Sequence, residues 1–329
     1  MAEGRKTWMD AVRGTCIFLV LLLHATVAVD HFAVRAPDWL MAFNRLFGPY
    51  RMPTLIFLSG MLLGRSLRKP LLPYAEGKLA QIYWPFLVWS IVILLAESRF
   101  TLEFILKTPI SAPTMLWYLW FLTAYYFIMF VLDRLKIPLI PVVIASLLAS
   151  TVLPDFLRMD RFAFLFAFFL IGHIVASRQY ALLGNCWLGM AGLLAAVAGA
   201  LINASGTIIQ YQATYAWAPL GMLLFITWFG QFYRSSAAFA YGEWVGRNSL
   251  VFYVIHFPVQ VVVTRGLRSF GVQEFWAIFP AAFFGSLIAG VVLQLLRERF
   301  ALVAGLFDFG ALARFVRRLR TATATAGAG

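Results

Sequence analysis

Charged residues are scarce in this chain, and their scarcity decides its broad class. Only 12% of the 329 residues are Asp, Glu, Lys or Arg, whereas 62% are hydrophobic. An ordinary soluble domain carries roughly 25% charged residues. Because long apolar runs recur along the sequence, we expect an all-α polytopic protein of the cell membrane, with several helices crossing the bilayer.

Cysteine and histidine are also rare, with two Cys and four His in the chain. Cys16 and Cys186 lie in or beside apolar runs, where a free thiol behaves as a small hydrophobic group. Two such residues provide neither a disulfide framework nor a metal motif. The sequence therefore predicts no metal site.

Apolar segments long enough to cross a bilayer recur along the chain. A span needs about 20 apolar residues to cross about 30 Å of hydrocarbon. By this criterion we predict ten spans, at residues 11–29, 46–64, 79–96, 114–132, 138–154, 161–177, 186–203, 213–231, 248–264 and 275–296. We expect residues 1–300 to form the membrane domain and residues 301–329 to form a basic amphipathic cytoplasmic tail with a frayed end.

The distribution of positive charge predicts the orientation of the ten spans. If the N-terminus is cytoplasmic, 18 Lys and Arg residues lie on the inside and 9 on the outside. Cytoplasmic loops are enriched in these residues, so both termini are expected inside. No aromatic-interleaved basic module points to nucleic acid, and anionic lipid at the inner surface is the expected partner of the basic tail.

Three ionisable residues occupy the first predicted span. Arg13 and His24 are 11 residues apart, so on an α-helix they share a face and lie about 16 Å apart along its axis. Asp10 precedes Arg13 by about one turn and could pair with it. Arg13 alone is compatible with a snorkelling anchor, and His24 with an interhelical hydrogen bond. The pair also suits chemistry, because an imidazole can move a proton or act as a nucleophile.

Four segments resemble one family in its own order. The first span with its Asp-x-x-Arg-Gly start, then "YRMPTLIFLSGMLLG", "WYLWFLTAYY" and "GRNSLVFYVIHFPV", is similar to the motifs of the acyltransferase 3 family of membrane O-acyltransferases. The match spreads over most of the chain. One position departs from the pattern: Gln81, four residues before Pro85, stands where the family usually has a basic residue, and Lys78 on the preceding turn is a possible substitute.

The resemblance implies a cytoplasmic acyl-CoA donor, often acetyl-CoA, and an acceptor hydroxyl on a sugar, glycan unit or lipid-linked intermediate. It also implies that His24 is catalytic and Arg13 important for activity. The phosphates of coenzyme A suit a basic collar at the inner mouth. The candidates for that collar are Arg13, Arg65, Arg68, Lys69 and Lys78.

Two mechanisms are open for His24. It either acts as a general base on the acceptor hydroxyl or is itself acylated and passes the group on. Further candidates for contact with the acceptor are Arg51, Ser59, Trp120 and His256. Each also has a structural interpretation: Arg51 as an interfacial anchor and Ser59 as part of a small-residue packing seam. Trp120 could serve in aromatic packing, and His256 could support its helix.

Two other classes of membrane protein remain as alternatives. A transporter or lipid or glycan flippase would also have many spans and buried charges. Such folds often show two related halves with broken helices in corresponding positions, and we find no such correspondence here. A purely structural membrane subunit would not need His24.

Overall fold

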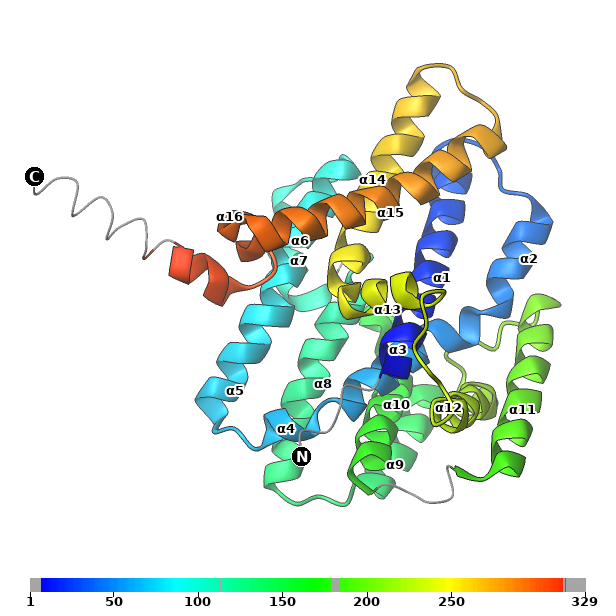
Figure 1. Cartoon of the computed structure of the whole chain (residues 1–329), viewed down its shortest axis with the longest axis vertical. Helices are drawn as coiled ribbons and strands as arrows, with labels where there is room; N and C mark the ends of the chain where they lie inside the picture. Colours follow the sequence, from blue (N-terminus) through cyan, green and yellow to red (C-terminus); the bar gives the residue numbers. More distant parts are fainter. Residues whose placement is uncertain (1–6, 113, 179–183, 316, 318–329) are drawn as a thin grey trace, which may run out of the picture. The chain divides into compact units, whose positions relative to one another are not determined.

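The computed structural model describes residues 7–112, 114–178, 184–315 and 317 (Figure 1). Within these ranges every regular element is a helix and no strand occurs. The chain divides into two compact units: unit 1 comprises Met1–Arg68 and Ile128–Ser249, and unit 2 comprises Lys69–Phe127 and Leu250–Gly329.

Unit 1 contains the N-terminal helices and a second, later group. Its elements are α1 (Thr7–Phe32), α2 (Asp38–Leu46), α3 (Gly48–Met61), α4 (Gly64–Leu67), α9 (Leu139–Val152), the 3₁₀ turn η2 (Phe156–Arg158), α10 (Met159–Arg178), α11 (Cys186–Ala204), the 3₁₀ turn η4 (Ala213–Tyr215), α12 (Trp217–Phe229) and α13 (Ala240–Arg247). The helix α8 (Trp117–Arg134) runs from unit 2 into unit 1.

Unit 2 is built from two separate stretches of helices. Its elements are α5 (Leu71–Lys78), the π-helical turn η1 (Leu79–Tyr83), α6 (Trp84–Ala96), α7 (Leu102–Ser111), α14 (Ser249–Ser269), α15 (Phe275–Arg299) and α16 (Ala301–Gly305). Pro85 explains the wide turn η1, because proline has no N–H for the carbonyl four residues earlier.

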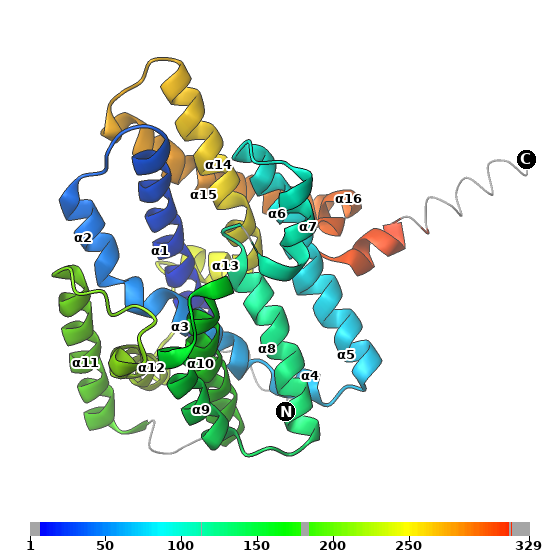
Figure 2. The ribbon, with the colours of Figure 1, turned by 180° about the vertical axis from the view of Figure 1, so that it is seen from behind.

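Glycines allow very close helix packing in unit 1. The helix α10 packs against both α3 and α9 (Figures 1 and 2). A Cβ added at Gly60 of α3 would lie 2.1 Å from the carbonyl oxygen of Phe169, and one added at Gly172 of α10 would lie 2.1 Å from that of Phe57. Such small-residue crossings are typical of membrane helices, where close backbone packing drives association.

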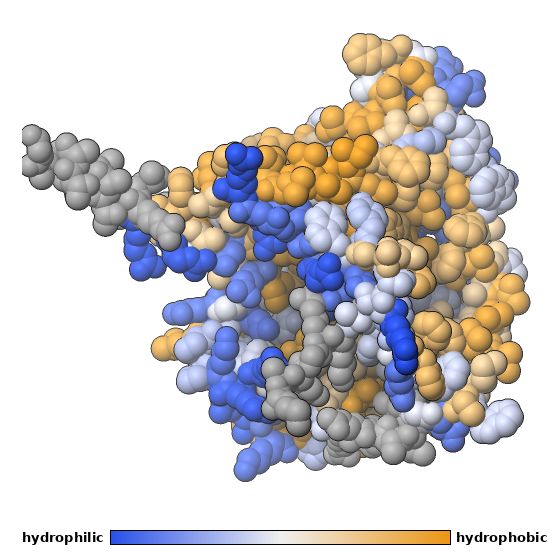
Figure 3. Space-filling model, viewed as in Figure 1, coloured by the Kyte–Doolittle hydropathy of each residue, from blue (hydrophilic) through white to orange (hydrophobic). Residues whose placement is uncertain are grey.

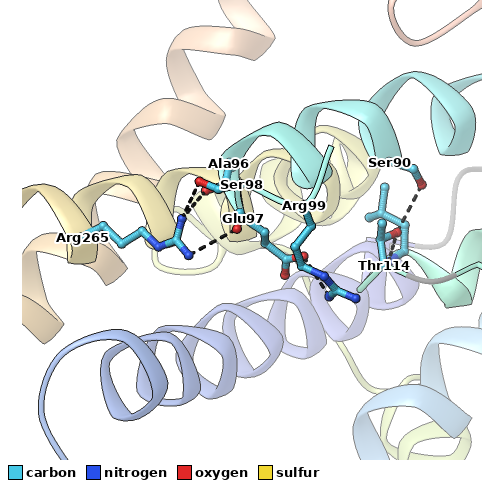
Figure 4. A network of polar contacts seen from close by, with 8 residues as sticks. Ser90, Ala96, Glu97, Ser98, Arg99, Thr114 and Arg265 are labelled. Carbon is cyan, nitrogen blue, oxygen red and sulfur yellow. Dashed lines mark hydrogen bonds and ion pairs between the residues drawn. The ribbon is translucent and has the colours of Figure 1, made fainter. Parts of the chain in front are cut away.

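An arginine closes the end of α6 in unit 2. Figure 4 shows Arg265 of α14, which donates to the carbonyl oxygens of Ala96 and Glu97, both at 3.2 Å, and to the Ser98 hydroxyl at 3.0 Å. The last carbonyls of a helix have no partner within it and carry partial negative charge. The guanidinium therefore caps α6 and ties it to α14.

The predicted spans fall on helices. Each of the ten predicted ranges overlaps at least one helix. Among the described residues, six helical segments are long and apolar enough to cross a membrane, namely Thr7–Phe32, Leu71–Ala96, Phe156–Ser177, Cys186–Ala204, Ser249–Ser269 and Phe275–Arg299. The all-helical, multi-pass class is confirmed, whereas the count of ten spans and the cytoplasmic position of both termini stay predictions.

The helix α15 presents a strongly apolar surface. Its exposed side chains include Trp276, Phe284, Ile288 and Val292. Figure 3 shows a continuous hydrophobic surface, coloured orange, over α15. An exposed apolar surface of this extent is typical of a helix that faces lipid.

The start of the predicted tail packs on α6. Phe307 is only 1% exposed and its ring centroid lies 5.4 Å from that of Trp89. The Trp84 indole N–H donates to the carbonyl oxygen of Gly305 at 2.8 Å. The domain boundary at residue 300 and the binding of anionic lipid stay predictions, and residues 316 and 318–329 of the tail lie outside the described residues.

Candidate functional site

The helix α1 carries Arg13 and His24 on one stripe. It is continuous from Thr7 to Phe32, so the predicted shared face and the separation of about 16 Å hold. Ile17, Val20 and Ala28 lie on the same stripe and are at most 3% exposed, whereas Arg13 and His24 are only half-buried. Both ionisable side chains therefore keep accessible surface within an otherwise buried stripe.

The helix α13 fixes the end of α1 that carries Arg13. A Cβ added at Gly14 would lie 2.0 Å from the Gly242 carbonyl oxygen, and one added at Gly246 would lie 1.8 Å from that of Asp10. The two backbones therefore touch. Asp10 is only 4% exposed at this crossing. Its predicted pairing with Arg13 stays a prediction.

A buried carboxylate beside this crossing was not predicted from the sequence. Glu243 of α13 is 4% exposed, accepts a hydrogen bond from the Tyr233 hydroxyl at 2.9 Å and lies 3.8 Å from the Arg247 guanidinium. Burial, together with the Glu243 carboxylate, raises the pKa of Tyr233 to about 12. The signal that could have identified this segment is the spacing of Gly242 and Gly246, four residues apart, just before the "GRNS" motif.

Arg51 braces three helices of unit 1. It is 4% exposed, and its guanidinium donates to the carbonyl oxygens of Leu19 at 3.0 Å and Asn44 at 2.8 Å. The Asn44 amide in turn donates to the Thr26 hydroxyl at 3.1 Å. Leu19 precedes His24 by five residues, so this brace holds α1 from a face about 140° away from His24. Arg51 is thus a buried brace and not an interfacial anchor, and its predicted contact with an acceptor is untested.

The other candidates of unit 1 lie on α3 and α4. Ser59 is buried and its hydroxyl donates to the Leu55 carbonyl oxygen at 2.8 Å within the same helix. Arg65 and Arg68 are exposed, at α4 and the residue after it. Their predicted roles in binding acceptor and donor are not tested by these positions.

The remaining basic candidates belong to unit 2. Lys69 is exposed, whereas Lys78 is half-buried with its ammonium 3.7 Å from the centroid of the Tyr126 ring. Gln81 lies within η1 and is exposed. The wide turn η1 begins directly after Lys78 and contains Gln81. Lys78 and Gln81 therefore do not have the relative orientation that two residues three apart have on a regular α-helix.

Trp120 and His256 are also in unit 2. The Trp120 indole donates to the Pro109 carbonyl oxygen at 3.1 Å. His256 is 1% exposed, and its Nδ1 lies 3.2 Å from the Phe252 carbonyl oxygen. Among the described residues, no group of three or more His, Cys, Asp or Glu side chains is arranged to hold a metal ion.

Comparison with known proteins places these features in a family. Residues 6–295 match the acyltransferase domain of the acyltransferase 3 family. The inner membrane protein YcfT of Escherichia coli (strain K12) is 26% identical over 185 residues, which cover 46% of this chain and 51% of that protein. The chain thus matches about half the length of this curated relative, and no solved structure matches it. Because the domain match covers most of the chain, this protein belongs to the acyltransferase 3 family, and its long apolar helices are those of a multi-pass membrane protein.

Proposed function

We propose that this protein moves an acyl group, acetyl in the simplest case, from cytoplasmic acyl-CoA to a hydroxyl of a glycan, sugar unit or lipid-linked intermediate. The observation that carries the proposal is the accessible Arg13 and His24 pair on one buried stripe of α1. The similarity to YcfT, an inner membrane protein, supports a place in the cell membrane.

The donor's phosphates are expected to bind basic side chains. Arg13, Arg65 and Arg68 supply guanidinium groups in unit 1, and Lys69 and Lys78 supply ammonium groups in unit 2. Arginine suits phosphate because its planar fork can donate two parallel hydrogen bonds. With the phosphates near Arg13, the long pantetheine arm is able to follow the stripe of about 16 Å and place its thioester near His24.

In the direct mechanism, His24 is a general base. It takes the proton of the acceptor hydroxyl while the oxygen attacks the thioester carbonyl, so a C–O bond forms and the C–S bond breaks. The proton then passes from the imidazolium to the leaving thiolate, which yields free coenzyme A. Such catalysis typically contributes about 10²- to 10⁴-fold in rate.

In the relay mechanism, His24 is a nucleophile. Its ring nitrogen attacks the thioester carbonyl, the C–S bond breaks, and the thiolate leaves as free coenzyme A with the proton that the imidazole gives up. The acceptor hydroxyl then attacks the acyl-imidazole, the C–N bond breaks, and the hydroxyl proton returns to the ring nitrogen. The relay splits one transfer into two and carries the acyl group toward the outer side. Both mechanisms require the half-buried imidazole to reach the donor and the acceptor.

The first prediction concerns His24. The variant His24→Ala is expected to lose acyl transfer from radiolabelled acetyl-CoA in membranes by at least about 100-fold while it still binds coenzyme A. His31→Ala is the matched control, because His31 is exposed at the end of the same helix. Unchanged transfer by a folded His24→Ala protein would remove the central claim.

The two mechanisms and the transporter alternative separate in a second experiment. Incubation with labelled acetyl-CoA alone, followed by mass spectrometry of peptides containing residue 24, detects an acyl-His24 adduct in the relay. Ternary-complex kinetics without an adduct favour the direct mechanism.

A transporter or flippase would move its substrate with no acyl transfer. The glycan that accumulates without its acyl group in cells lacking the protein would identify the acceptor.

A further inference from the structure

The chain turns back onto α6 after its last long helix. We call residues 300–309, which contain α16, the C-terminal strap. The strap lies beside α6 in unit 2 (Figures 1 and 2). The Trp84 indole N–H donates to the Gly305 carbonyl oxygen at 2.8 Å, and the centroid of the six-membered or five-membered indole system lies 5.1 Å from that of the Phe309 ring. The first residue of α6 is therefore attached to the strap at two points.

A buried phenylalanine anchors the middle of the strap. Phe307 is only 1% exposed, and its ring centroid lies 5.4 Å from that of Trp89 and 5.0 Å from the Arg297 guanidinium carbon. The residues after the strap fold back as well, because a Cβ added at Gly305 would lie 3.0 Å from the Cβ of Leu312. The strap therefore packs against both α6 and the end of α15.

The exposed side chains of the strap and of the residues next to it are apolar or basic. The exposed apolar residues are Phe300, Leu302 and Phe309, and the exposed arginines are Arg299, Arg314 and Arg317. Asp308 is the one acidic residue in the sequence from Arg299 to Gly329, and its carboxylate lies 3.9 Å from the Arg314 guanidinium. A segment of this composition at the end of a membrane span has the charge and the apolar surface to bind a bilayer with anionic headgroups.

The strap and the start of α6 both fall on the side predicted to be cytoplasmic. The charge pattern places the end of the predicted span 275–296 and the beginning of the span 79–96 inside. The contact between Trp84 and Gly305 brings these two ends together, as that orientation requires. The anionic surface that the strap would meet is therefore that of the inner leaflet.

The strap is attached directly beside the wide turn η1. Trp84 is the first residue after η1, and Lys78, a candidate for binding the donor, is the last residue before it. The two flanks of the turn are held separately. Trp84 is held by the strap, whereas the Lys78 ammonium lies 3.7 Å from the centroid of the Tyr126 ring of α8. Because a π turn is rare and often lies at a functional site, what holds its flanks bears on how Lys78 is oriented.

We propose that the C-terminal strap couples anionic lipid at the cytoplasmic surface to binding of the acyl-CoA donor. Lipid headgroups bind the exposed arginines beside the strap and keep it seated on α6. The seated strap fixes Trp84 and with it the turn that orients Lys78 for the donor's phosphates. This inference rests on the proposed function, which assigns acyl-CoA as the donor, and it adds a lipid that regulates donor affinity.

The test measures binding of radiolabelled acetyl-CoA to the purified full chain in nanodiscs of phosphatidylglycerol or of phosphatidylcholine. The wild type is expected to bind acetyl-CoA at least about fivefold more tightly in phosphatidylglycerol, which is the lower end of typical coupling between two sites. Surface electrostatics alone predicts the opposite sign, because coenzyme A is itself an anion and an anionic bilayer repels it.

Two variants separate the steps of the coupling. Arg314→Gln combined with Arg317→Gln removes charges expected to bind lipid, and Phe307→Ala removes the buried anchor of the strap. Both proteins should bind acetyl-CoA no more tightly in phosphatidylglycerol than in phosphatidylcholine. In phosphatidylcholine the charge variant should match the wild type.

A milder variant and two controls accompany them. Trp84→Phe keeps an aromatic ring but loses the N–H donor to Gly305, so it should lose part of the lipid effect even if Phe307→Ala does not fold. Phe270→Ala changes a phenylalanine of unit 2 that is 87% exposed, and Arg234→Gln combined with Arg268→Gln removes two exposed arginines elsewhere. Both controls should behave like the wild type.

The outcomes decide between lipid and donor as the ligand of the arginines. Equal affinity of the wild type in the two lipids, or a lipid effect that the strap variants keep, overturns the proposal. Equally weakened binding of the charge variant in both lipids would place Arg314 and Arg317 on the donor's phosphates instead of on lipid, and this result also overturns it.

Acyl transfer separates this proposal from the proposed function. If acetyl-CoA binding depends on lipid but transfer is unchanged in His24→Ala, the proposed function fails and the coupling stands. If transfer depends on His24 but the wild type binds acetyl-CoA equally in the two lipids, the coupling fails and the proposed function stands.

Discussion

Two arginines of unit 1 show opposite uses of a cation among apolar helices. Arg13 keeps accessible surface on the stripe that leads to His24. Arg51 is buried, and its guanidinium donates hydrogen bonds to the carbonyl oxygens of Leu19 and Asn44. The spacing of Arg13 and His24 was readable in the sequence because both lie on one helix. The partners of Arg51 were not, because they are main-chain atoms of two other helices that any residue type could supply.

Tyr233 offers a test of the buried carboxylate. Replacing it by Phe removes the donor to Glu243 and is expected to destabilise the protein by about 1 kcal/mol, which is typical of a lost hydrogen bond. Tyr241→Phe is the control, because Tyr241 lies exposed on α13, the helix that carries Glu243. Thermal unfolding in detergent measures both variants.

The same pair predicts a pH dependence. The pKa of Tyr233 is raised from 10.0 to about 12, so its neutral form is favoured in the folded state. Its contribution is therefore fully present below pH 10 and is lost as the pH rises toward 12. The stability gap between wild type and Tyr233→Phe should shrink over this window, and a gap that widens there would contradict the assignment.

Among the secondary-structure elements, the long apolar helices were predictable and several short ones were not. Each predicted span overlaps a helix, because a run of apolar residues is a direct requirement of the bilayer. The helices α2, α7 and α13 have only 8 to 10 residues and moderate hydrophobicity, so a search for membrane-length runs passes over them. The α13 crossing with α1 was missed for this reason.

Two glycines of α13 give a matched pair for testing that crossing. A Cβ at Gly246 would meet the Asp10 carbonyl oxygen at 1.8 Å, whereas one at Gly242 has nothing within 4 Å. Gly246→Ala should therefore destabilise the protein by about 1–3 kcal/mol or more and lower acyl transfer. Gly242→Ala should be neutral or slightly stabilising, because alanine is the better helix former. Thermal unfolding and transfer assays check both, and equal behaviour of the two variants would refute the close packing.

At the level of the complete chain, the candidate residues are distributed over both units. Arg13, His24 and Arg51 belong to unit 1, whereas Lys78, Trp120 and His256 belong to unit 2. The sequence motifs predicted the family that the domain match shows. They could not predict this partition, which depends on packing between segments far apart in the chain.

The predicted orientation is testable with reporter fusions. Alkaline phosphatase inserted near Arg99 or Arg158 should be active, because these segments are expected outside, and fusions near Lys136 or Arg234 should be inactive. A fluorescent protein at the C-terminus should mature if that end is cytoplasmic. Active phosphatase at Arg234 would reverse the assignment and with it the proposed side of donor binding.

The wide turn η1 changes how this chain is compared with its relatives. A π turn is in effect one residue inserted into an α-helix, so residues before it are rotated relative to the count made back from Pro85. An alignment without a gap would therefore pair Gln81 with a residue that points in a different direction in a relative without this turn. The absence of a basic residue at position 81 then reflects a shift in helix register as well as a substitution. Lys78, whose ammonium lies over the Tyr126 ring, is the side chain to compare with the basic residue of the family.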